Sequence, residues 1–243
     1  MIEISNFSKI FVANWKLNGN FEFIDKYFNQ IKIPDNDNNC IIVCPTSIYI
    51  DYLSRKKNNR IFTGAQNVSS HKFGAYTGEI SVNSLKEFNV NFCIVGHSER
   101  RNLFNETNND IKLKSAELIS NQIVPIICIG EKFDHKESGK TNQFLAKQLD
   151  ESIPESSNSK NTIIAYEPVW SIGSGLTPSL EEINETHDFI RKLSKKFLDF
   201  KILYGGSVKA ENSSDINSLS NVDGLLIGGA SLKTEEFTRI ITD

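Results

Sequence analysis

The chain has 243 residues, of which 39% are hydrophobic and 23% charged, a composition typical of a globular protein and not of a disordered, collagenous or coiled-coil one. Its formal net charge is −3, from 27 basic and 30 acidic residues, so it lacks the basic excess typical of nucleic-acid or membrane binding. The length allows one large domain or two small ones. Because no low-complexity linker divides the sequence, we expect residues 1–243 to form a single domain.

The N-terminal segment and the cysteines indicate a cellular location. Residues Met1–Asn6 lack the basic start and apolar core of a signal peptide. The longest apolar runs, such as Val124–Ile129, are far shorter than the roughly 20 residues that span a bilayer. The four cysteines lie in apolar runs without metal-binding spacing: Cys40, Cys44, Cys93 and Cys128. We therefore expect a cytoplasmic protein with buried reduced thiols, no metal site, and no membrane or nucleic-acid partner.

Short apolar or β-branched runs recur along the chain and predict eight strands: Ile10–Asn14, Cys40–Cys44, Ile61–Ala65, Phe92–Val95, Val124–Ile129, Thr162–Ala165, Lys201–Tyr204 and Gly224–Ile227. The stretches between them are long enough for helices, for example Asn108 to Gln122 and Ser179 to Phe200. Ser179 is typical of a helix N-cap. Strands this apolar indicate a parallel sheet covered on both faces. Eight βα units predict an α/β protein whose sheet closes into a (β/α)₈ barrel.

Polar residues and glycines follow five of these strands, and the carboxyl ends of barrel strands meet at one mouth. The segments are Asn14-Trp15-Lys16, Gly96 to Arg101, Tyr166 to Trp170, Gly205-Gly206-Ser207 and Gly228 to Ser231. Each has an ordinary structural interpretation when taken alone: a solvated turn for Lys16, a helix cap beside ion pairs for His97, and tight turns for the glycine pairs. Their convergence on one mouth favours a functional site.

The residue types at this mouth suit one chemistry. Pro168 holds Glu167 in an extended conformation beside a glycine-rich segment. A carboxylate base, a histidine that donates a hydrogen bond and an ammonium group are what proton abstraction next to a carbonyl requires. Glycine turns ahead of helices direct backbone N–H groups at a phosphate without any net positive charge. Gly173 and Gly175 indicate a lid that closes over the base.

Six motifs, in order along almost the whole chain, resemble those of the triosephosphate isomerase family: Asn14-Trp-Lys16, Phe73 to Glu79, Val95 to Arg101, Ala165 to Gly175, Tyr204 to Val208 and Gly228 to Leu232. The resemblance implies a single-domain TIM barrel that interconverts dihydroxyacetone phosphate and D-glyceraldehyde 3-phosphate without a cofactor. It also implies a role in glycolysis and gluconeogenesis.

The resemblance further implies individual roles. Glu167 is expected to be the base, His97 the neutral electrophile, Lys16 the cation that stabilises negative charge, and Asn14 a hydrogen-bonding partner of the substrate oxygen. Segment 168–176 is expected to form the lid. Supporting contacts and phosphate contacts are expected from Glu99, which orients Lys16, from Ser98, which contacts Glu167, and from the backbone N–H groups of Gly173, Ser207, Gly228 and Gly229.

The segment Gln66–Glu79 resembles the long third loop through which members of this family form homodimers. Thr77 is then expected near Asn14 and Lys16 of the partner subunit. The aromatic side chains of Phe73 and Tyr76 give this loop apolar surface to bury. An exposed loop without a partner is the alternative.

Two other functions fit the same residues. The first is a related isomerase that acts on a different sugar phosphate, such as a four-carbon ketose phosphate, since its catalytic groups look the same. The second is a catalytically silent, phosphate-binding dimer. The presence of Lys16, His97 and Glu167 together argues against the second alternative.

Overall fold

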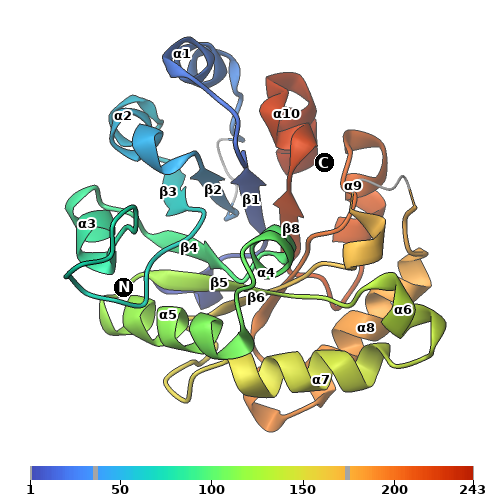
Figure 1. The fold of residues 1–243 in the computed structure, drawn as a ribbon. Coiled ribbons are helices and arrows are strands. Elements are labelled where there is room, and N and C mark those ends of the chain that lie inside the picture. Colours follow the sequence, from blue (N-terminus) through green and yellow to red (C-terminus); the bar gives the residue numbers. More distant parts are fainter. Residues whose placement is uncertain (1, 35–37, 173–175, 243) are drawn as a thin grey trace.

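In the computed structural model, which describes residues 2–34, 38–172 and 176–242, eight parallel strands close into a barrel in chain order (Figure 1). The strands are β1 (Ile10–Asn14), β2 (Cys40–Cys44), β3 (Ile61–Ala65), β4 (Phe92–Val95), β5 (Val124–Ile129), β6 (Ile163–Tyr166), β7 (Lys201–Tyr204) and β8 (Gly224–Ile227). The predicted (β/α)₈ barrel is confirmed. The sixth strand is shifted by one residue from its predicted bounds, because pairing with β5 and β7 runs from Ile163 to Tyr166.

Helices surround the barrel (Figure 1). They are α1 (Phe21–Gln30), α2 (Ile50–Lys56), α3 (Val82–Glu87), α4 (Ser98–Leu103), α5 (Asn108–Ser120), α6 (Phe133–Glu137), α7 (Thr141–Ser152), α8 (Leu180–Lys192), α9 (Ala210–Asn217) and α10 (Thr234–Thr242). Short 3₁₀ turns cover Ile4–Asn6, Ser47–Tyr49, Val169–Ser171, Lys195–Phe197 and Gly229–Leu232.

Two predicted helices end earlier than expected. Helix α5 stops at Ser120, and Gln122 has a left-handed backbone with φ of 65°, which no helix can continue. Helix α8 stops at Lys192, because Ser194 is extended and its side chain accepts a hydrogen bond from the N–H of Lys196, which starts a separate 3₁₀ turn. The predicted cap is correct: Ser179 and Glu182 form a reciprocal capping box at the start of α8.

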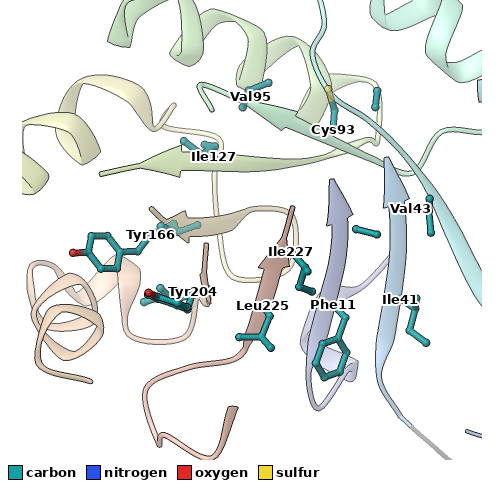
Figure 2. Packing of buried hydrophobic residues seen from close by; sticks show 14 of the residues in the cluster. Phe11, Ile41, Val43, Cys93, Val95, Ile127, Tyr166, Tyr204, Leu225 and Ile227 are labelled. Atoms are coloured by element: carbon teal, nitrogen blue, oxygen red, sulfur yellow. The ribbon is translucent and has the colours of Figure 1, made fainter. Parts of the chain in front are cut away.

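Alternation along the strands divides the apolar residues into two cores. One set fills the barrel interior, for example Val12, Ile42 and Ile126. The other packs between the strands and the helices. Figure 2 shows members of this outer set, which include Phe11, Ile41, Val43, Val95, Ile127, Tyr166, Tyr204, Leu225 and Ile227.

The same alternation delivers polar side chains to the mouth of the barrel. In β1, Ile10 and Val12 belong to the interior set and Asn14 follows at the same spacing of two. In β6, Ile163 and Ala165 are interior, and Glu167 comes next on that face. In these two strands the inward column of apolar residues therefore ends in a polar side chain at the carboxyl end.

The remaining buried polar groups support the fold. All four cysteines are buried and unpaired, and burial raises the pKa of Cys40 and Cys93, which keeps these thiols protonated. His187 lies on the buried face of α8, where burial lowers its pKa to about 3, so it is a neutral core residue. Among the described helices, none has the length and apolarity needed to cross a bilayer.

Candidate active site

A cavity of about 340 Å³ opens at the carboxyl end of the barrel. Its lining combines seven of the residues predicted from sequence, which are Asn14, Lys16, His97, Glu167, Ser207, Gly228 and Gly229. The predicted phosphate contact at Gly173 lies outside the described residues. Strands β1, β4, β6, β7 and β8 supply this lining, so segments more than 200 residues apart in sequence meet in one cavity.

Glu167 is held at the cavity wall with its side chain only 2% exposed. Its backbone N–H donates to the carbonyl of Ile129 at 2.7 Å, which extends the pairing of β6 with β5 by one residue. One carboxylate oxygen lies 2.9 Å from Nε2 of His97, and the other accepts the N–H of Ser98 at 3.1 Å. Burial opposes ionisation, but His97 and Ser98 outweigh it and lower the pKa of Glu167. The carboxyl group is therefore a carboxylate, ready to accept a proton.

His97 is the N-cap of α4 and also lines the cavity. The two interpretations of His97 from the sequence, a helix cap and a residue of the candidate site, are therefore compatible. Its Nδ1 accepts the N–H of Glu99 at 3.2 Å. Burial lowers the pKa of His97, whereas the neighbouring Glu167 carboxylate raises it. In this arrangement the pKa of His97 is raised overall. The capping contact works against protonation, because a nitrogen that accepts a hydrogen bond carries no proton. It favours neutral imidazole with hydrogen on Nε2.

Lys16 has a strained backbone that several contacts hold in place. Its φ is 53°, in the left-handed region that ordinary side chains disfavour. Its N–H donates to Oδ1 of Asn14 at 3.2 Å, and its carbonyl accepts from Nε2 of Gln66 at 2.8 Å. Its Nζ lies 2.5 Å from Oε1 of Glu99, a residue of α4. Strain of this kind persists only where surrounding contacts over-determine it, as at functional sites.

The opposite side of the cavity is built from backbone. The segments after β7 and β8 place Ser207, Gly228 and Gly229 in the lining, ahead of α9 and of the 3₁₀ turn Gly229–Leu232. Helix starts present free N–H groups, which favour an anion. Lys209 and Lys233 also line this side of the cavity and were not predicted. This side of the cavity has the donors that a phosphate requires.

Three further residues, to which the sequence alone assigned no individual role, shape the position of Glu167 and its surroundings. A side chain at Gly130 would clash with the backbone of Glu167, since its Cβ would lie 1.7 Å from the Glu167 carbonyl oxygen. A Cβ at Gly205 would lie 2.9 Å from Cγ of Glu167. Glu131 is buried and accepts hydrogen bonds from Tyr166 and Trp170. The sequence could have indicated these residues by their positions, because Gly130 and Glu131 directly follow β5 and Gly205 directly follows β7.

The segment Gln66–Glu79 lies apart from this cavity. Phe73 and Thr77 are exposed, and the ring of Tyr76 stacks on His71 with centroids 3.7 Å apart. A second cavity of about 590 Å³ lies between the ends of this segment and α4, and it reaches Lys16 and His97. Among the described residues, no group of three His, Cys, Asp or Glu side chains is placed to hold a metal ion.

Comparisons with known proteins agree with this geometry. The family model described as triosephosphate isomerase matches residues 9–243. The chain is 45% identical to triosephosphate isomerase of Francisella tularensis subsp. mediasiatica over 96% of both sequences. It is 41% identical to the Francisella philomiragia protein of that name over 96% of both, and 39% identical to the Shewanella denitrificans one over 95% of both. The chain therefore belongs to the triosephosphate isomerase family.

Proposed function

We propose that the chain interconverts dihydroxyacetone phosphate and D-glyceraldehyde 3-phosphate, within glycolysis and gluconeogenesis. The observation that carries the proposal is the convergence of Glu167, His97 and Lys16 on one cavity whose far side is built from glycine turns. Membership of the family supports it. The reaction needs a base, an electrophile and an anion site, and these residues supply all three without a cofactor.

In this mechanism Glu167 takes a proton from the carbon next to the carbonyl group and returns it to the neighbouring carbon. To reach the substrate, its carboxylate leaves the N–H of Ser98, which holds it in the structure. His97, as neutral imidazole, donates from Nε2 to the oxygen on which negative charge grows. Lys16, oriented by Glu99, stabilises that charge, and Asn14 hydrogen-bonds the substrate oxygen.

The phosphate group binds on the opposite side of the cavity. Backbone N–H groups of Ser207, Gly228 and Gly229 donate to it, and Gly173, which lies outside the described residues, completes the set. This contact supplies binding energy remote from the reacting carbons. Segment 168–176, of which residues 173–175 lie outside the described residues, is proposed as the lid that excludes water during the reaction, so that the enediolate does not lose phosphate.

The active form is proposed to be a homodimer. Exposed apolar side chains, including Leu17, Ile48, Phe73, Leu103 and Phe104, gather on the segments that follow β1, β2, β3 and β4. Exposed apolar residues in such number indicate a protein interface. The segment Gln66–Glu79 enters the 590 Å³ cavity of the other subunit, where Thr77 approaches Asn14 and Lys16 of the partner subunit.

The chain is proposed to act in the cytoplasm as a single domain. All eight βα units belong to one closed barrel, which supports the single domain. Buried thiols without disulfides agree with a reducing compartment.

A coupled assay with D-glyceraldehyde 3-phosphate, run beside a four-carbon ketose phosphate, tests the reaction. We expect turnover of the triose phosphate near the diffusion limit of about 10⁸–10⁹ M⁻¹s⁻¹ in kcat/KM, and little turnover of the longer sugar. Preference for the four-carbon substrate would instead assign the chain to the related isomerase with the same catalytic residues. Inactivity on both would leave a silent phosphate-binding protein.

The variant Glu167→Asp tests the assignment of the base. Shortening the side chain withdraws the carboxylate by one methylene while the phosphate contacts stay, so kcat should fall about a hundredfold with KM little changed. Glu181→Asp, the same change at an exposed site on α8, is the matched control and should keep full activity. Equal losses in kcat and in substrate affinity would make Glu167 a structural residue.

A further inference from the structure

A cavity of about 850 Å³, larger than the catalytic one, is lined by residues of α4, α5, α6 and α7. Helix α7 contacts both α5 and α6 (Figure 1). One side of the cavity belongs to the segment from Arg101 to Asn109, and the other to α7. Ser98, Gly130 and Val169 form part of its lining, and they also border Glu167. Cavities of about 300–1,000 Å³ typically hold small organic ligands.

The rim of this cavity is cationic although the chain as a whole is slightly acidic. Lys132, Lys140 and Lys147 all line it. Lys147 lies 3.9 Å from Glu151, whereas the other two lysines have no carboxylate within ion-pair distance among the described residues. Glu106 also lines the cavity, but Lys114 and Arg100 already neutralise it. The rim therefore has unpaired positive charge available for an anion.

The floor has two side-chain hydrogen-bond donors without a partner among the described residues. Gln148 is only 5% exposed, and its Oε1 accepts the N–H of Gly130 at 2.8 Å. Its side-chain NH₂ group has no partner among the described residues. Ser98 is 6% exposed, and its hydroxyl is likewise without a hydrogen bond to any described residue. Neither donor atom is sealed inside the protein, so both are open to the cavity and available to a ligand with acceptor atoms.

The face of α7 toward the cavity is built for polar contact. Phe144, Lys147, Gln148 and Glu151 recur there at helical spacing, where a covered helix face would be apolar, and Lys140 precedes them as the N-cap of the helix. The ring of Phe144 packs on His135 of α6 with centroids 4.1 Å apart. This wall therefore combines an aromatic surface with charged and amide groups.

We propose that this cavity binds a nucleoside phosphate. The phosphates lie at Lys132 and Lys140, the base lies on the aromatic wall of Phe144, and Gln148 and Ser98 donate to oxygen atoms of the ligand. This cavity of about 850 Å³ has room for such a ligand, whereas the catalytic cavity of about 340 Å³ is small for it. Binding here does not depend on the reaction proposed above.

The site contacts the residues that position Glu167. The N–H of Ser98 donates to its carboxylate, and Gly130, held by Gln148, lies against its backbone. A ligand that engages Ser98 and Gln148 stabilises the arrangement in which Glu167 stays away from the substrate. It should therefore lower kcat and leave KM unchanged, which is the pattern of a noncompetitive inhibitor.

Titration calorimetry with ATP as the probe tests binding, with 2-phosphoglycolate present to fill the catalytic cavity. We expect one ATP per chain, bound about tenfold more weakly by the double variant Lys132→Ala/Lys140→Ala, since charge-assisted hydrogen bonds to phosphate are lost. Lys195→Ala, an exposed lysine without an ion pair among the described residues, is the matched control and should bind as wild type. Phe144→Leu should weaken ATP binding without weakening that of inorganic tripolyphosphate.

Several results would overturn the site. Displacement of 2-phosphoglycolate by ATP would place the nucleotide in the catalytic cavity, and so would inhibition that is only competitive with the triose phosphate. Equal binding of ATP and tripolyphosphate would remove the nucleoside from the proposal. Unchanged ATP affinity in the double lysine variant would contradict it directly.

Discussion

Glu167 shows how single residues determine the geometry of the site. Its carboxylate is fixed by His97 and by the N–H of Ser98, and its Cγ packs where Gly205 has no side chain. Lys16 depends in the same way on Asn14, Gln66 and Glu99. The proposed catalytic groups thus owe their positions to neighbours from other strands as much as to their own backbone.

The variant Gly205→Ala tests this dependence. Its Cβ would lie 2.9 Å from Cγ of Glu167, closer than unstrained carbon atoms approach, so the base must shift. A displacement of about 1 Å can cost a hundredfold in rate, and we expect kcat to fall by about that factor with a smaller change in KM. Gly229→Ala provides the comparison, because no atom lies within 4 Å of its Cβ and the N–H is retained. Both variants are measured by steady-state kinetics. Equal kcat values in the two variants would show that the missing side chain of Gly205 does not position Glu167.

At the scale of elements, helix starts hold the loops around the mouth in place. Helix α8 follows the proposed lid segment and begins with the capping box of Ser179 and Glu182. The backbone N–H of Ser179 and the ammonium of Lys136 lower the pKa of Glu182 below its ordinary value of 4.5. A carboxyl group whose pKa is lower in the folded state stabilises the fold above its unfolded pKa, and this contribution is lost as the pH falls through the folded pKa.

Two variants test the contribution of this cap. Ser179→Ala should cost about 1 kcal/mol in the free energy of unfolding, measured by urea denaturation, because the N–H of Glu182 loses the Ser179 hydroxyl as its acceptor. Ser220→Ala, at an exposed serine without a side-chain hydrogen bond among the described residues, should cost little. Glu182→Gln should destabilise the protein at neutral pH, and its difference from wild type should shrink as the pH drops below 4.5. If the difference in the free energy of unfolding between wild type and Glu182→Gln did not change with pH, the negative charge of Glu182 would not contribute to the cap.

At the scale of the whole molecule, the closed barrel leaves no free sheet edge, so association depends on the loops at its mouth. The exposed apolar residues and the 590 Å³ cavity lie on that side, next to Lys16 and His97. Assembly and catalysis are therefore proposed to share the same end of the barrel.

Thr77→Arg tests the proposed dimer. A guanidinium in place of a short side chain would have to be buried against the partner's cavity, so we expect monomers with strongly reduced kcat. Sedimentation velocity gives the mass, and the same sample is assayed. Ser156→Arg, on an exposed loop between α7 and β6, is the control and should remain dimeric and active. A fully active dimer of the Thr77 variant would refute the role of this segment.

Local chemistry made much of this protein predictable. Apolar runs marked the eight strands, and seven of them have the predicted bounds, because strand pairing follows side-chain patterns that a single segment already carries. The Ser179 cap was predictable for the same reason. The polar residues at the strand ends identified the mouth, since alternation puts Asn14 and Glu167 on the inner face.

Contacts between distant segments depended on closure of the barrel. Pairing of β1 with β8 brings Gly228 next to Lys16, and pairing of β5 with β6 brings Gly130 against Glu167. The packing of distant segments also places Lys209 and Lys233 at the 340 Å³ cavity and forms the 850 Å³ cavity beside α7. The alternation of residues in the sequence predicts on which face of its own strand a side chain lies. Its neighbours across the mouth depend on the register and curvature of the whole sheet, and those are set only when all eight strands pair.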